Sequence, residues 1–143
     1  MRPALSGLEK DGEAVMGKAS KTELSKRSVY WIPKARYHEL RYFCLQFDEW
    51  LRAVVALDGL ATRECRDPTE REALERLRFE NKIKMVEDSA KKAGFELAPW
   101  LIIGVTTGKS YDTISASNRI PCCREVYYTM YRRFFWLLDK IRD

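Results

Sequence analysis

Large apolar side chains recur every three or four positions between Ala35 and Val55, which is the spacing of one face of an α-helix. The pattern predicts a long helix over about residues 34–57. Asp58-Gly59 then combines two residue types that favour turns, so the sequence predicts that this helix ends there.

A second long helix is predicted over about residues 68–93, where charged residues of a solvated face alternate with apolar positions. Asp67 is a favourable N-cap, Pro68 suits the first helical position, and acidic residues follow in the first turn. Gly94 is expected to adopt the left-handed conformation that often ends a helix. We expect the two long helices to pair as a hairpin.

The last third of the chain predicts shorter elements. The apolar segment after Pro99 is expected to be a buried helix rather than a strand, because no other segment offers it a strand partner. Ser110 is a suitable N-cap for a helix over Tyr111–Ala116. Asn118 suits a left-handed turn position, and Pro121 suits the start of a final helix.

The final helix separates into two faces when its residues are placed at the helical period. The apolar stripe expected to face the core comprises Cys123, Val126, Tyr127, Met130, Phe134, Leu137, Leu138 and Ile141. The opposite, outward face comprises Arg124, Tyr128, Tyr131, Arg132 and Arg142. Phe135 and Trp136 fall outside the stripe, so they either pack against the preceding helices or form a surface for a partner.

These elements predict an all-α protein in which a long helical hairpin carries a C-terminal helix-turn-helix. Residues 1–28 are expected to be a mobile leader, residues 29–98 the hairpin, and residues 99–143 the helix-turn-helix region packed on it. A helix-turn-helix places the outward side chains at the start of its second helix in the major groove of DNA.

The charge of the chain favours the same interpretation. The 143 residues carry a formal net charge of +5, and residues 99–143 hold seven basic and four acidic side chains. Residues 30–98, in contrast, hold thirteen of each sign. A basic C-terminal third suits an acidic partner such as double-stranded DNA.

The candidate DNA-binding residues follow from position and chemistry. Arginine side chains can bind guanine edges or phosphates, and tyrosine hydroxyls can reach phosphate oxygens. Arg124, Tyr128 and Arg132 are the strongest candidates, with Tyr131 beside them. Arg119 and Arg133 are expected to contact phosphates, and Lys109 is expected either to contact a phosphate beside the supporting helix or to be a solvated loop residue. Pairing of Arg124 and Arg132 with the acidic residues of 64–88 would instead favour a structural role for that face.

The sequence contains no motif that supports an enzyme active site or a metal site. Only three residues separate Gly104 from Gly108-Lys109-Ser110, whereas a phosphate-binding loop needs four. His38 is the only histidine, and the four cysteines include no Cys-x-x-Cys pair. The sequence therefore predicts no enzyme activity, no cofactor and no metal site.

The start of the chain shows no secretory signal, and no apolar run is long enough to cross a membrane, so we expect a cytoplasmic protein without a membrane partner. The alternative to DNA binding is a non-enzymatic module that binds a host or phage protein or forms oligomers. DNA binding at paired half-sites would favour a homodimer.

Several segments resemble a known family. Residues 117–121 (Ser-Asn-Arg-Ile-Pro), 124–128 (Arg-Glu-Val-Tyr-Tyr) and 131–138 (Tyr-Arg-Arg-Phe-Phe-Trp-Leu-Leu) resemble the recognition region of the ArpU/RinA late-transcription regulators of phages and prophages. The C-terminal part of that family is similar to sigma-factor region 4. The segments at 30–40 and 43–50 resemble the N-terminal helix of prophage proteins of the same size. The resemblance implies a sequence-specific transcriptional regulator of phage or mobile-element genes, with RNA polymerase as a further partner.

Overall fold

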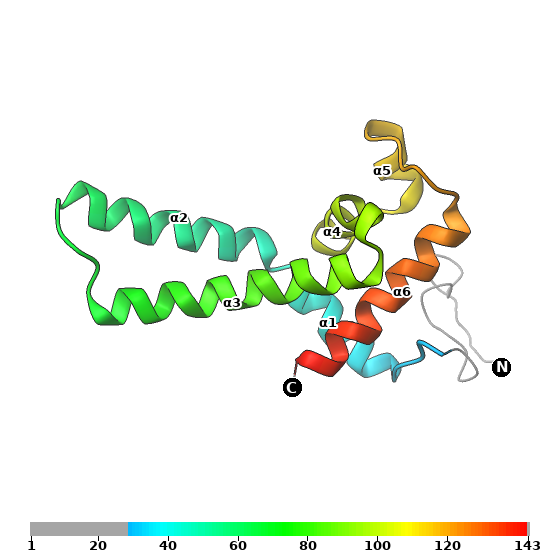
Figure 1. The fold of residues 1–143 in the computed structure, drawn as a ribbon, viewed down its shortest axis with the longest axis horizontal. Coiled ribbons are helices and arrows are strands. Elements are labelled where there is room, and N and C mark those ends of the chain that lie inside the picture. Colours follow the sequence, from blue (N-terminus) through cyan, green and yellow to red (C-terminus); the bar gives the residue numbers. More distant parts are fainter. Residues whose placement is uncertain (1–28, 143) are drawn as a thin grey trace.

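The computed structural model describes residues 29–142, and this part of the chain is all-α, as predicted (Figure 1). The predicted leader over residues 1–28 lies outside the described residues. The α-helices in chain order are α1 (Lys34–Cys44), α2 (Phe47–Arg63), α3 (Glu70–Ala93), α4 (Ala98–Thr107), α5 (Tyr111–Ser117) and α6 (Arg124–Ile141). A short 3₁₀ turn over Phe95–Leu97 joins α3 to α4.

The first predicted helix is two helices. Helix α1 ends at Cys44 and α2 begins at Phe47, so a break at Leu45-Gln46 interrupts the predicted span of 34–57. The rings of Phe43 and Trp50 pack across the break with centres 4.7 Å apart. The break allows α1 to pack on α6 while α2 pairs with α3.

The predicted end of that helix at Asp58-Gly59 is also wrong, because α2 continues to Arg63. A glycine inside a helix costs only about 1 kcal/mol relative to alanine, so one glycine does not have to end a helix whose neighbours pack well.

Both ends of α3 differ from the prediction. Thr69, rather than Asp67, is the N-cap, and its hydroxyl accepts a hydrogen bond from the Glu72 amide at 3.1 Å. The Glu72 carboxylate accepts one from the Thr69 amide at 2.9 Å, which completes a capping box. Pro68 therefore precedes the helix. Gly94 ends α3 with extended backbone (φ −170°, ψ 99°) rather than in the left-handed conformation.

Helices α2 and α3 run side by side and project away from the remaining helices (Figure 1). We call the projecting part, residues 51–81, the arm. Asp58 pairs with Arg76 across it, and at its base the Lys82 ammonium lies 5.8 Å from the centre of the Trp50 ring. These contacts fix an antiparallel register between the two helices.

Helices α1, α4, α5 and α6 and the C-terminal part of α3 form the body, which contains most of the core. The side chains with no more than 2% exposure include Leu40, Val86, Leu101, Tyr127, Phe134, Phe135 and Leu138. Arg36 of α1 donates to Asp139 of α6 at 2.6 Å, which joins the first and last helices.

Phe135 is buried because it packs against α1. Its ring packs edge-on against Tyr37 with centres 5.1 Å apart, so it belongs to the core and not to a partner surface. Trp136 is half-buried, with the Tyr30 ring 5.5 Å away and the Lys140 ammonium 4.1 Å from its own ring.

Helix α4 is the predicted buried helix, and it supports α5 and α6. Gly104 brings the α4 backbone against Tyr127 of α6, where a Cβ would overlap the tyrosine hydroxyl. Gly108 has a φ of 75° and ends α4 in the left-handed conformation that favours glycine. This glycine lets the chain turn directly into α5.

Candidate nucleic-acid interface

The α5–α6 unit, residues 109–142, has the predicted order of a short helix, a turn and a long helix. The Ser110 hydroxyl accepts a hydrogen bond from the Thr113 amide at 3.3 Å, so Ser110 is the N-cap that the sequence predicts. Helix α5 spans Tyr111–Ser117, one residue longer than expected. Ile114 is 2% exposed and anchors the helix to the core.

The turn is longer than predicted and differs in conformation. Asn118 is extended (φ −137°, ψ 95°), not left-handed. Helix α6 begins at Arg124 with Cys123 as N-cap, so Pro121 lies within the turn instead of opening the helix. Ile120 is 4% exposed, and its burial holds the middle of the turn against the core.

Two tyrosine hydroxyls fasten this unit together. The Tyr111 hydroxyl donates to the Cys122 carbonyl at 2.5 Å, and the Tyr128 hydroxyl accepts from the Tyr111 amide at 3.1 Å. Tyr128 therefore satisfies a free amide at the start of α5. In this structure its hydroxyl accepts a hydrogen bond within the unit.

The buried face of α6 is rotated relative to the prediction. Its buried residues are Tyr127, Tyr131, Phe134, Phe135 and Leu138. Tyr131, which we expected on the outward face, is only 7% exposed. Burial, together with a hydrogen bond to Tyr37, raises the pKa of Tyr131 well above its usual value.

Three residues that we predicted in the core are instead exposed to solvent. Val126 and Ile141 are each 45% exposed, and Cys123 is also exposed. The physical reason is the same: α1 packs on the side of α6 that contains Tyr131 and Phe135, so the opposite edge of the apolar stripe is left in solvent.

Arg124 lies at the first position of α6 and forms an ion pair with Asp112 in the first turn of α5. Both side chains are largely exposed, and the carboxylate raises the pKa of Arg124 through its hydrogen bond. The acidic partner of Arg124 is therefore in α5 and is not one of the acidic residues in 64–88, whose pairing with Arg124 would have favoured a structural role. An exposed pair of this kind contributes little to stability, so a phosphate can replace Asp112 at small cost.

The next two arginines are half-buried. Arg132 donates to the Thr129 hydroxyl at 3.2 Å, and desolvation lowers the pKa of its guanidinium. The Nε atom of Arg133 is buried and has no hydrogen-bond partner among the described residues. Both guanidinium groups are therefore less hydrated than those of exposed arginines.

Lys109 and Arg119 are exposed, at the N-terminal side of α5 and in the turn. Arg142 is different, since its guanidinium lies 4.1 Å from the centre of the Phe43 ring in α1. Arg142 was predicted on the same outward face as Arg124 and Arg132. It instead packs against α1, away from the start of α6.

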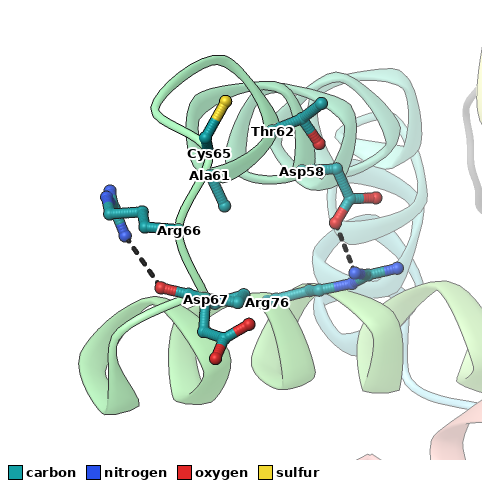
Figure 2. A pocket seen from close by; sticks show the side chains of 8 residues that line it. Asp58, Ala61, Thr62, Cys65, Arg66, Asp67 and Arg76 are labelled. Carbon is teal, nitrogen blue, oxygen red and sulfur yellow. Dashed lines mark hydrogen bonds and ion pairs between the residues drawn. The ribbon is translucent and has the colours of Figure 1, made fainter.

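A hollow lies at the tip of the arm (Figure 2). Its lining comprises Asp58, Ala61, Thr62, Cys65, Arg66, Asp67, Pro68 and Arg76. Both of its arginines are in ion pairs, Arg76 with Asp58 and Arg66 with Glu72. The first pair joins α2 to α3 and the second joins the connection to α3, so the hollow is explained by the structure of the hairpin.

Within residues 29–142, no group of three or more histidine, cysteine or acidic side chains is placed to hold a metal ion. No helix of the described part is both long and apolar enough to span a membrane. Comparison of the chain with models of protein families, with curated proteins and with solved structures finds no match.

Proposed function

We propose that the α5–α6 unit binds double-stranded DNA and that the protein is a transcriptional regulator. One observation carries the proposal: residues 109–133 hold five basic and two acidic side chains on a short helix, a turn and a long helix. Helix-turn-helix proteins share this excess of positive charge on two helices joined by a turn, and the turn of residues 118–123 is longer than the three or four residues usual in that motif.

We assign roles to the candidate residues according to their exposure and position. Lys109, Arg119 and Arg124 are exposed at the start of α5, in the turn and at the start of α6. The Arg124–Asp112 pair brings the starts of α5 and α6 together, so Lys109 and Arg124 flank the same corner. We assign phosphate binding to Lys109 and Arg119, and base-edge or phosphate binding to Arg124.

Arg132 and Arg133 lie farther along α6, where we expect them to contact the backbone or bases beyond the corner. Tyr128 and Tyr131 stabilise the unit in this scheme and do not bind DNA. Action on phage or mobile-element genes in the cytoplasm, with RNA polymerase as a further partner, extends the proposal through the resemblance to the ArpU/RinA regulators.

The test is retention of labelled genomic fragments by the full chain over a series of salt concentrations. Each phosphate contact steepens the slope of log affinity against log salt by about 0.9. The triple variant Lys109→Ala, Arg119→Ala, Arg124→Ala should therefore lower the slope by roughly 2 to 3 and reduce retention sharply.

The matched control removes three cations from α3: Lys84→Ala, Lys91→Ala, Lys92→Ala. All three lysines are exposed, and the net charge changes equally. The control should retain DNA with nearly the original slope. Equal losses in both variants, or no binding at low salt by the original chain, would reject the proposal.

A further inference from the structure

The outer face of α3 in the arm combines exposed leucines with unpaired charges. Leu74 and Leu77 are 57% and 51% exposed. A shallow depression on this face is lined by Leu74 together with Glu70, Arg71, Glu75 and Arg78. None of these four charged residues has an ion-pair partner within residues 29–142.

The inner side of the arm is different. Arg76 pairs with Asp58 of α2, and Glu72 pairs with Arg66 of the connection. Leu74 precedes Arg76 by two residues, which is about 200° around an α-helix. Leu74 therefore lies on the side of α3 that faces away from α2, where no other described element covers it.

We propose that this face, Glu70 to Arg78 of α3, binds the same face of a second copy of the chain in an antiparallel, two-fold arrangement. A two-fold axis at Leu74 brings each residue opposite the residue at an equal distance on the other side of Leu74. The two Leu74 side chains then meet, and Arg78 of each copy faces Glu70 of the other. Leu77 of both copies then lies on one side of the contact, and Arg71 of both copies lies on the other side.

Charge favours a second copy over other partners. The face holds two acidic and two basic side chains, so its charge is balanced and complementary to itself in this register. A nucleic acid or an anionic membrane would meet Glu70 and Glu75 as well as the arginines. The projection of the arm from the body leaves room for the second α3 (Figure 1).

The inference is independent of DNA binding and is tested without DNA. Sedimentation velocity of the full chain over a range of concentrations measures the self-association. Glu70→Arg and Arg78→Glu each place like charges opposite one another, and each should weaken the dimer by roughly tenfold or more. The double variant E70R/R78E restores opposite charges and should return the affinity to within about threefold of the original.

Leu74→Glu removes the central apolar contact and should yield a monomer, whereas Lys91→Glu, a charge reversal at an exposed site elsewhere on α3, should leave the dimer intact. All the variants change exposed residues, and circular dichroism checks that they fold. A monomer at every concentration, or a dimer that the single reversals do not weaken, would overturn the proposal. Failure of the double variant to recover would also overturn it, since the register requires the recovery.

Discussion

The body and the arm are stabilised by different interactions. In the body, Leu40, Leu101, Tyr127, Phe134 and Leu138 are completely buried. In the arm, residues 51–81, only Ala61 is buried. One ion pair among the described residues, Asp58–Arg76, joins the two arm helices, and an exposed ion pair contributes at most about 1 kcal/mol.

The body is therefore the more rigid region, and the arm has apolar side chains left exposed. The body holds the α5–α6 unit through aromatic packing, which suits the fixed geometry that the proposed DNA-binding surface needs. The arm leaves Leu74 and Leu77 exposed and buries little apolar area of its own. We therefore expect the body to determine the global stability and the arm to open locally at lower free energy.

The largest effect should come from the body core. Phe134 is completely buried, so Phe134→Ala should lower the free energy of unfolding by about 3–5 kcal/mol. Val55 in the arm is 69% exposed, and Val55→Ala should change it by less than about 0.5 kcal/mol. Urea denaturation followed by circular dichroism measures both. Similar losses of unfolding free energy in the two variants would contradict the claim that the body, and not the arm, determines the global stability.

Two glycines provide a matched comparison. A Cβ on Gly104 would overlap the Tyr127 hydroxyl, so Gly104→Ala should destabilise the protein by about 1–3 kcal/mol. Gly59 in the arm has nothing within 4 Å of an added Cβ, and Gly59→Ala should stabilise by about 0.5–1 kcal/mol through helix propensity.

Tyr127→Phe sharpens this comparison. The Tyr127 hydroxyl is buried and has no hydrogen-bond partner among the described residues, so it can be removed at little cost. The double variant Gly104→Ala, Tyr127→Phe should recover most of the loss caused by Gly104→Ala. Denaturation midpoints measure the recovery, and an unrelieved loss would show that the hydroxyl is not the obstacle.

The ion pair between Asp58 and Arg76 should have a smaller effect. Both side chains are more than 40% exposed, so solvent screens their interaction. A double-mutant cycle with Asp58→Ala and Arg76→Ala should give a coupling energy below about 1 kcal/mol. A much larger coupling would mean that ion pairs stabilise the arm as strongly as packing stabilises the body.

The subtlest expected effect is a pH dependence at the arm tip. Hydrogen bonds from Arg66 and from the Thr69 amide lower the pKa of Glu72 from its ordinary 4.5 to about 2. Because the folded-state pKa is lowered, this stabilisation is present above about pH 4.5 and is lost as the pH falls toward 2. NMR titration of the Glu72 carboxyl measures the shift, and Arg66→Ala should return the pKa toward its ordinary value.

Much of the helical structure could be predicted because helix caps and apolar periodicity are local. Ser110 and the buried segment after Pro99 are examples. The break at Leu45-Gln46 was missed since the apolar periodicity continues across it, and the break depends on α1 and α2 packing against different helices. The residues around the break do not by themselves indicate which helices α1 and α2 pack against.

The candidate interface was predicted less completely. Lys109, Arg119 and Arg124 are exposed as expected, because charged side chains seldom lose their hydration. The outward position predicted for Tyr131 was wrong, since a tyrosine can bury its ring and hydrogen-bond within the protein. Which face of α6 is covered depends on Tyr37 of α1, far away in the sequence.

Hydrogen exchange of the full chain, measured with and without duplex DNA, tests the central claim most directly. We predict that DNA slows exchange in residues 109–133 and leaves the arm, residues 51–81, unchanged. The free protein should also exchange faster in the arm than in the last half of α6. Protection by DNA in the arm alone, or no protection at any amide, would contradict the assignment of DNA binding to the α5–α6 unit.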